Sequence, residues 1–178
     1  LLIFTYIIFY YNSINMDIYD CFMYFDEDLL LDLRLNIMNK YVKKFIITES
    51  TYLHSGRKKD LNFDIKKFQK FKDKINYIII DNPPEGIEEI DQDDSVEIKN
   101  KKILDNSLKR ENNQRNMQIK GLKHAHDNDL IFSSDLDEIP NLEKFNFKGK
   151  ITLFEQNVFY YKFNLMQPNF KWVGTRAC

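Results

Sequence analysis

The sequence predicts an α/β fold, in which a mainly parallel sheet is flanked by helices. The first observation is that short apolar runs, typical of buried strands, alternate along the chain with longer segments of helical periodicity. Strands that alternate with helices usually pair in parallel, and the helices then cover both faces of the sheet. The second observation is that acidic residues follow directly after the apolar runs. In a parallel sheet those positions gather at the carboxyl ends of the strands, where ligands bind.

The first half of the chain contains three of the predicted strands and two helices. The aromatic and apolar run at 18–25 predicts a strand, and the acidic residues 26–28 mark the start of a helix because negative charge suits a helix N-terminus. Two prolines at 83–84 follow the third strand and prevent its continuation. We expect strands at 18–25, 44–48 and 75–80, and helices at about 29–42 and 65–71.

The second half begins with an acidic, irregular segment at 85–98, which predicts a surface loop. A long helix is expected from about 103 to 124, and the apolar run 130–132 predicts a fourth strand. Residues 150–163 are rich in β-branched and aromatic residues, so they predict one or two further strands. The chain contains no internal repeat and no Gly/Ser linker, and we therefore expect a single domain.

Composition and charge exclude several classes of protein. An apolar share of 43% is that of a globular chain, and a net charge of −1 lacks the basic excess of a sequence-independent nucleic-acid binder. We therefore expect no nucleic acid as a partner. The two cysteines, Cys21 and Cys178, give no disulfide framework, which fits a reducing, cytoplasmic setting. Cys21 lies in an apolar run, which predicts a core residue rather than a nucleophile.

Residues 1–15 form an apolar leader that contains no basic residue. Its apolar run is shorter than the roughly 20 residues that span a bilayer, and it lacks the basic region and the cleavage site of a signal peptide. Two interpretations remain open: a truncated membrane anchor, or upstream sequence translated ahead of a start at Met16. We favour the second, so membrane association has little support from the sequence.

The strongest local signal is the segment IFSSDLDEIP, in which Asp135 and Asp137 follow the fourth predicted strand. Two carboxylates at a turn can hold one hard divalent cation and leave coordination positions open for phosphate oxygens. Such a cation acts as a Lewis acid that neutralises charge on a departing diphosphate. Acidic pairs at turns are also common as solvated residues. The position directly after an apolar strand favours the interpretation as a metal site.

Five segments, in this order along the chain, resemble successive blocks of one known family. They are MDIYDCFMYFDEDLLLDLRLNIM, FIITES, HSGRKKDLNF, RENNQRN and DNDLIFSSDLDEIP. The chain resembles glycosyltransferase family 17 over residues 17–178, and known members transfer N-acetylglucosamine from UDP-N-acetylglucosamine to the core β-mannose of N-glycans. The resemblance implies a GT-A-like, Rossmann-like fold, an inverting mechanism, a UDP-N-acetylglucosamine donor and a glycan acceptor. It also implies a divalent cation, manganese rather than magnesium.

The resemblance also implies roles for individual residues in donor binding. Asp135 and Asp137 would bind the metal, and Asp135 would lie at the nucleotide-sugar as well. Arg115 would face the nucleotide-sugar, although its alternative is an ion pair with Glu111, four residues earlier on the same helix. Lys59 belongs to the family's Gly-x-x-Lys loop and would contact phosphate as a point charge. Gly56, at the start of that loop, is equally expected as a turn residue.

Other residues complete the expected site. An inverting transferase needs a general base to take the proton of the acceptor hydroxyl, and Glu155 is the best candidate within the chain. Trp172 could stack on a sugar ring or lie in the core. Glu138 either completes the acidic block or caps its turn. Arg34, on an apolar helix face, is expected to satisfy a buried carboxylate such as Glu49.

Residues 16–178 are therefore expected to form a glycosyltransferase catalytic domain that is incomplete at its C-terminus. With 21 lysines to 5 arginines, the composition indicates an AT-rich genome and a microbial enzyme that decorates a surface polysaccharide. A membrane-anchored, Golgi-type enzyme is the alternative. Two other functions compete: an inactive sugar-nucleotide-binding module and, with less support, an aspartate-based phosphohydrolase. Such phosphohydrolases usually carry an Asp-x-Asp-x-Thr motif after the first strand, where this chain has FDED.

Overall fold

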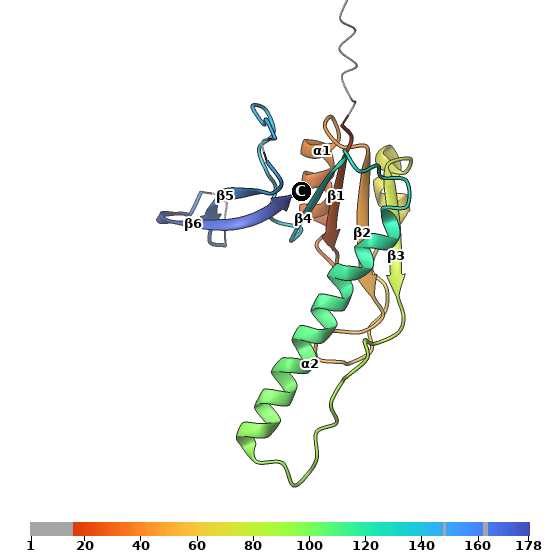
Figure 1. Cartoon of the computed structure of the whole chain (residues 1–178), viewed down its shortest axis with the longest axis vertical. Helices are drawn as coiled ribbons and strands as arrows, with labels where there is room; N and C mark the ends of the chain where they lie inside the picture. Colours follow the sequence, from red (N-terminus) through yellow and green to blue (C-terminus); the bar gives the residue numbers. More distant parts are fainter. Residues whose placement is uncertain (1–15, 148, 162–163) are drawn as a thin grey trace, which may run out of the picture.

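The fold is built on one sheet in which six strands pair in the order β3-β2-β1-β4-β6-β5. The computed structural model describes residues 16–147, 149–161 and 164–178, so the apolar leader at 1–15 lies outside the described residues. The strands are β1 (Ile18–Met23), β2 (Lys44–Ser50), β3 (Ile75–Ile80), β4 (Leu130–Ser134), β5 (Thr152–Phe159) and β6 (Met166–Ala177). The first four pair in parallel and the last two are antiparallel. The predicted α/β class with a mainly parallel sheet is confirmed (Figure 1).

Helices cover both faces of the parallel strands, as the alternation of apolar residues requires. The helical segments are α1 (Asp28–Met38), η1 (Ile65–Phe71), α2 (Val96–Asn116) and η2 (Met117–Gly121). On one face, Leu31 and Leu35 of α1 pack into a core cluster with Phe22 of β1 and Phe45 of β2. On the other face, a smaller cluster joins alternate strand residues to the segment after η2; it comprises Tyr19, Cys21, Ile46, Leu122 and Ala125. Cys21 is thus a core residue, as predicted.

The long helix α2 differs from its prediction at both ends. It begins at Val96, inside the segment expected to be a loop, because the side chain of Ser95 caps it and accepts a hydrogen bond from the amide of Ile98. It ends at Asn116, where η2 takes over. Only Asn106 and Gln114 are buried along α2, and much of the helix projects beyond the sheet (Figure 1). A helix with so little buried surface carries almost no apolar periodicity to reveal its start.

Arg34 has a different partner from the one expected. The sequence correctly predicts that Arg34 satisfies a buried carboxylate, but the choice of Glu49 is wrong. Its Nη2 donates to Oδ1 of Asp20 at 2.7 Å and its Nε donates to Oδ2 at 2.9 Å, and both side chains are fully buried. Asp20 lies in β1 on the face that α1 covers, whereas Glu49 accepts hydrogen bonds from the Tyr77 hydroxyl and from backbone amides of the loop after β2.

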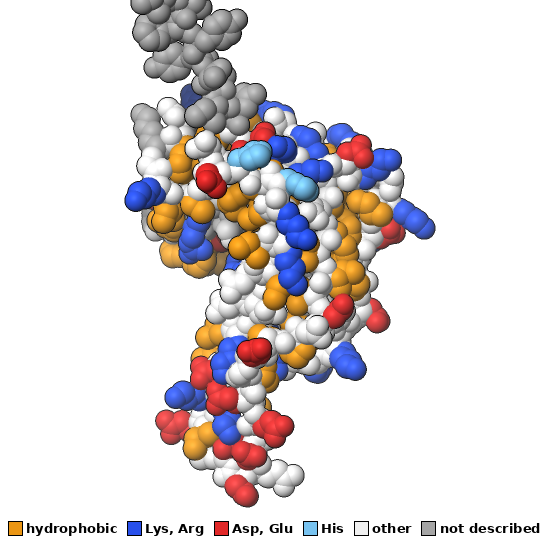
Figure 2. Space-filling model, turned by 45° about the vertical axis from the view of Figure 1, so that its right-hand side comes forward, with side chains coloured by type: hydrophobic (Ala, Val, Ile, Leu, Met, Phe, Trp, Pro, Cys, Tyr) orange, Lys and Arg blue, Asp and Glu red, His pale blue; other side chains and the backbone are white. Residues whose placement is uncertain are grey.

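The surface is mixed in charge. Acidic side chains gather at the end of the molecule formed by the loop before α2 and the start of that helix (Figure 2). Lysines lie among them, and Lys102 pairs there with Asp94 at 2.6 Å. Within the described residues, no helix combines the length and the apolar character needed to cross a bilayer.

Candidate active site

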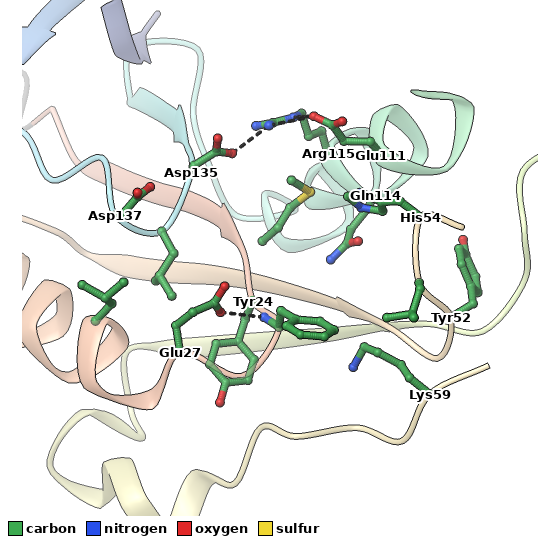
Figure 3. Close-up of a pocket in the computed structure, with 15 residues that line it drawn as sticks. Tyr24, Glu27, Tyr52, His54, Lys59, Glu111, Gln114, Arg115, Asp135 and Asp137 are labelled. Carbon is green, nitrogen blue, oxygen red and sulfur yellow. Dashed lines mark hydrogen bonds and ion pairs between the residues drawn. The ribbon is translucent and has the colours of Figure 1, made fainter. Parts of the chain in front are cut away.

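A cavity of about 550 Å³ opens at the carboxyl ends of β1, β2 and β4. Five segments line it: the turn after β1, the first turn of α1, the loop after β2, the last turns of α2, and the turn after β4. This is the place where the polar residues after the apolar runs were expected to meet. The residues of the cavity that carry side-chain chemistry are Tyr24, Glu27, Tyr52, His54, Lys59, Glu111, Gln114, Arg115, Asp135 and Asp137 (Figure 3).

The turn after β4 is held in place by hydrogen bonds from the side chains of Arg34 and Glu138 to its backbone. Arg34 donates from Nη1 to the carbonyl oxygens of Asp135, Leu136 and Glu138 at 2.9, 3.0 and 3.2 Å. Glu138 caps the turn, since its Oε2 accepts a hydrogen bond from the amide of Asp135 at 2.9 Å. Leu136 points into the core and is 5% exposed. The chain direction therefore leaves the side chains of Asp135 and Asp137, on either side of Leu136, facing outward.

The two aspartate side chains extend on the same side of the turn, toward the open cavity (Figure 3). Asp137 makes no side-chain hydrogen bond or ion pair with another described residue, and its pKa is raised above the ordinary aspartate value. Partial loss of hydration is the main cause of the raised pKa, and the neighbouring carboxylates of Asp135 and Glu138 add to it. Concentrated negative charge of this kind would be relieved by a bound cation.

The donor set fits a hard divalent cation that keeps free coordination positions. Asp135 and Asp137 supply carboxylate oxygens, which Mg²⁺ and Mn²⁺ both accept. Among the described residues, no group of three or more His, Cys, Asp or Glu side chains is arranged to hold a metal. A cation held here by two carboxylates would complete its coordination with water and with oxygens of a ligand.

Arg115 lines the cavity from α2, where it makes the expected ion pair with Glu111 and a second one with Asp135 that the sequence did not predict. Its Nη2 donates to Oε1 of Glu111 at 3.0 Å, the i,i+4 pair on the helix. The same Nη2 donates to Oδ1 of Asp135 at 2.7 Å. The guanidinium therefore places positive charge on one of the two candidate metal ligands. Gln114, its neighbour on the helix, is buried and ties α2 to β2 by donating to the Thr48 carbonyl at 3.1 Å.

Lys59 lies on the side of the cavity opposite the aspartates (Figure 3). Its Nζ pairs with the buried carboxylate of Glu49 and donates to the carbonyl of Asp60 at 2.9 Å. The ammonium is thus already neutralised by a protein carboxylate, and a contact with phosphate stays a prediction. Gly56 is the turn residue of this loop, because its φ of +90° is unfavourable for other residues and its amide donates to the Leu53 carbonyl at 2.8 Å.

The family model described as glycosyltransferase family 17 matches residues 9–172. The chain belongs to glycosyltransferase family 17. Comparisons with curated proteins and with solved structures gave no match. Membership means that this family 17 chain is a glycosyltransferase, which works with a sugar donor and a glycan acceptor.

A second cavity of this family 17 protein, of about 660 Å³, lies on the other side of the turn after β4. Glu155 and Trp172 line this second cavity rather than the first, and Asp135 and Asp137 line both. Trp172 is not a core residue: it is 49% exposed, and its Nε1 donates to Oε1 of Glu138. The two cavities therefore meet at the paired aspartates.

The sequence indicates Glu27 only as one of the acidic residues that follow the first strand, and it does not single out Tyr52 or His54. Glu27 lies in the predicted helix-start signal, but its carboxylate turns back and accepts from the amides of Phe25 and Asp26 at 3.1 Å. Tyr52 and His54 come from the loop after β2, which the sequence marks only as polar. The available signal is their position shortly after a strand end, the same signal that identified the aspartates.

Proposed function

We propose that this chain is an inverting, metal-dependent glycosyltransferase that transfers N-acetylglucosamine from UDP-N-acetylglucosamine to a glycan. The proposal rests on one observation: Asp135 and Asp137 lie at the carboxyl end of β4, at the boundary between two cavities. A transferase must bring a donor and an acceptor together at one point, and this boundary is suited to that purpose. Family membership supports the choice of reaction, and the resemblance described above supports the donor, the GT-A-like fold and manganese.

The first cavity would hold the nucleotide diphosphate. Asp135 and Asp137 would hold the cation, which would neutralise the charge that develops on the leaving diphosphate. Arg115 stands beside them and would add a guanidinium, whose planar fork suits phosphate oxygens. The buried Arg34 keeps the turn in place through the three backbone carbonyls. Such preorganisation matters because misplacement of a charge-stabilising group by about 1 Å can lower the reaction rate by about a hundredfold.

Glu155 is proposed as the general base. The acceptor hydroxyl would form a bond to the anomeric carbon, the bond from that carbon to the diphosphate oxygen would break, and the hydroxyl proton would pass to the Glu155 carboxylate. Glu155 is exposed in the second cavity and makes no side-chain hydrogen bond with another described residue. The competing carboxylate, Glu138, already accepts one hydrogen bond on each oxygen, from the Asp135 amide and the Trp172 indole.

The setting and the acceptor belong to the proposal as well. We propose a cytoplasmic, microbial enzyme that builds a surface polysaccharide, on the basis of the lysine-rich composition and of two free cysteines. An inactive binding module would use the same first cavity, and only turnover separates it from the enzyme. A phosphohydrolase with an aspartate nucleophile has less support, because Asp20, the carboxylate within β1, is fully buried against Arg34.

The first test is a thermal-shift screen of UDP, UDP-sugars and other nucleotides, each with Mn²⁺ and with EDTA. At a ligand concentration about a hundred times the dissociation constant, linkage adds about 2.7 kcal/mol, or about 5–10 °C for a chain of this size. We expect this shift with UDP-N-acetylglucosamine and Mn²⁺ and little shift in EDTA. Equal shifts with purine nucleotides, or none with any nucleotide, would contradict the proposed donor. Consumption of UDP-N-acetylglucosamine that needs both metal and acceptor then separates the enzyme from an inactive module.

Arg115 gives a second prediction, because its guanidinium pairs with Asp135, one of the two proposed metal ligands. In Arg115→Gln the competing cation is gone, so Mn²⁺ alone should bind about two- to fivefold more tightly, the scale of a partly exposed ion pair. UDP in the presence of Mn²⁺ should bind at least about tenfold more weakly, because a charged hydrogen bond to phosphate is lost. Isothermal titration calorimetry measures both affinities.

The matched control is Arg110→Gln. Arg110 lies on the same helix but donates to the His54 carbonyl at 2.9 Å, not to Asp135. This control should leave the affinity for Mn²⁺ unchanged. If Arg115→Gln weakens Mn²⁺ and UDP together, Arg115 stabilises the site instead of competing for it.

A further inference from the structure

The second cavity lies between the turn after β4 and the hairpin formed by β5 and β6. It shares Asp135 and Asp137 with the first cavity, so a molecule bound in it would reach the same two carboxylates as the nucleotide diphosphate. With a volume of about 660 Å³ it lies within the usual range of small-molecule sites. The cavity is therefore large enough for a sugar unit next to the proposed reaction centre.

The side chains of the second cavity combine flat apolar surfaces with uncharged hydrogen-bonding groups. Its aromatic residues are Phe159, Phe170 and Trp172, and its amide residues are Asn141, Gln156 and Asn157. Amide side chains can donate and accept, as hydroxyl groups require. An aromatic face packs well against the C–H face of a pyranose ring while the hydroxyls around the ring turn to polar neighbours. This combination matches the surface of a sugar.

The charged residues that line the second cavity are all acidic. Four carboxylates line it, from Asp135, Asp137, Glu138 and Glu155, and no lysine or arginine is among its described lining residues. Lys171 lies on β6 between Phe170 and Trp172 without lining the cavity, and it donates to Oδ1 of Asn157. Carboxylates accept hydrogen bonds from hydroxyls but repel phosphate and carboxylate groups. A neutral ligand is thus favoured over an anionic one.

The indole of Trp172 is held by a hydrogen bond to Glu138, and about half of the side chain stays exposed. Its indole donates to Oε1 of Glu138, while Oε2 of the same carboxylate accepts from the Asp135 amide at 2.9 Å. The Thr175 hydroxyl donates to the Glu138 carbonyl at 2.7 Å and ties β6 to the turn. Gly174 permits this close packing, because a Cβ there would lie 2.3 Å from Oε1 of Gln156 and 2.8 Å from Cδ of Glu138. The ring is therefore preorganised beside the paired aspartates.

We propose that the second cavity is the acceptor site and that it selects an uncharged saccharide. Trp172 and Phe170 would pack against the sugar ring and the amides would bind its hydroxyls. Glu138 and Glu155, the two carboxylates that the proposed cation does not bind, would disfavour acceptors that carry phosphate or uronic acid groups close to the reacting sugar, and Asp135 and Asp137 would add to this when no cation is bound. This inference rests on the proposed function, because it takes the paired aspartates as the meeting point of donor and acceptor. It adds the place of the acceptor and a selection by charge.

Trp172 is the only tryptophan of the sequence, so its fluorescence reports on this cavity alone. The experiment titrates the full chain, without metal, with neutral disaccharides (β-mannobiose, cellobiose and lactose) and with the 6-phosphate of each. We expect at least one neutral disaccharide to change the emission of Trp172 saturably, and its phosphorylated form to bind at least about tenfold more weakly. Calorimetry on the same pairs gives affinities that do not depend on the fluorophore.

Two variants make the test specific to the cavity. Phe170→Ala removes a half-exposed ring of the lining and should weaken the neutral disaccharide at least about fivefold. Tyr160→Ala is the matched control, since Tyr160 is a similarly exposed aromatic residue of the same hairpin that does not line the cavity. Both variants should keep the stabilisation by UDP and Mn²⁺.

The outcomes separate this inference from the proposed function. If no neutral disaccharide changes the emission or gives heat at millimolar concentration, the acceptor site is wrong, even if UDP and Mn²⁺ still stabilise the protein. If the phosphorylated forms bind as tightly as the neutral ones, selection by charge is wrong. If a neutral disaccharide binds while no nucleotide does, the saccharide site stands and the proposed donor fails.

Discussion

Replacement of both Asp135 and Asp137 by asparagine is expected to remove the stabilisation by UDP and Mn²⁺ and to lower glycosyl transfer by at least about a thousandfold. Asparagine keeps the size of each side chain but replaces a charged ligand with a weak neutral one. A Lewis-acid cation contributes several kcal/mol to stabilisation of the transition state, and about 4 kcal/mol corresponds to a thousandfold change in rate. Thermal shift and the rate of UDP release measure the two effects.

The fold should survive this double substitution, since the contacts that hold the turn involve backbone atoms. Arg34 binds carbonyl oxygens, and Glu138 accepts from the amide of Asp135. The chain also supplies a matched control, because Asp91 and Asp93 form a second Asp-x-Asp in the acidic loop before α2, outside both cavities. Conversion of this second pair to asparagine should change neither readout. An undiminished response to Mn²⁺ in the first double variant would place the metal elsewhere.

Arg34→Met is expected to lower the free energy of unfolding by about 3–5 kcal/mol, the scale for removal of one partner from a buried ion pair. The substitution leaves the fully buried carboxylate of Asp20 without its ion-pair partner. It also removes the hydrogen bonds that Arg34 donates to the Ser134 hydroxyl and to three carbonyls of the turn, although the Glu138 carbonyl keeps its bond from the Thr175 hydroxyl. Urea denaturation followed by circular dichroism measures the loss.

Companion variants identify the cause of that loss. Arg34→Lys keeps the positive charge but lacks the planar guanidinium, whose several N–H groups bind Asp20 and the turn at once. The stability of this variant should therefore lie between those of the original protein and Arg34→Met. Lys43→Met breaks an exposed pair with Asp17 and should cost no more than about 1 kcal/mol. Arg34→Met with Asp20→Asn should recover part of the stability, since the buried charge of Asp20 is removed together with its partner, but this double variant should still bind Mn²⁺ with UDP poorly. Full recovery of ligand binding in this double variant would show that Arg34 does not position the turn.

Local patterns were enough to predict the parallel half of the sheet. The runs that form β1 to β4 are short, apolar and followed by polar residues. The runs of β1 and β2 are largely buried, whereas β3 lies at the sheet edge and leaves Ile79 exposed, which its apolar run does not predict. The strand β6 was missed because its first eight residues are all exposed, so its sequence shows no alternation of apolar and polar residues. Pro168 also argues against a strand interior. Its place in the sheet depends on pairing with β4 and β5, which no local pattern encodes.

The candidate site divides in the same way. Asp135, Asp137 and Arg115 could be named from the sequence because each lies in a distinctive segment, and all three line the first cavity. The partner of Arg34 could not be named, since Asp20 is a charged residue inside an apolar strand and its face is decided by the position of α1. The second cavity was invisible to the sequence because it exists only where β6 returns beside the turn after β4.

The shared boundary of the two cavities bears on the order of chemical events. Asp135 and Asp137 border both cavities, and Glu138 links the turn after β4 to the indole of Trp172. Direct displacement at such a boundary requires a ternary complex, in which both substrates are present before either product leaves. No sugar would be bound covalently to the protein between half-reactions, and a ligand in one cavity would affect binding in the other through the two aspartates that border both.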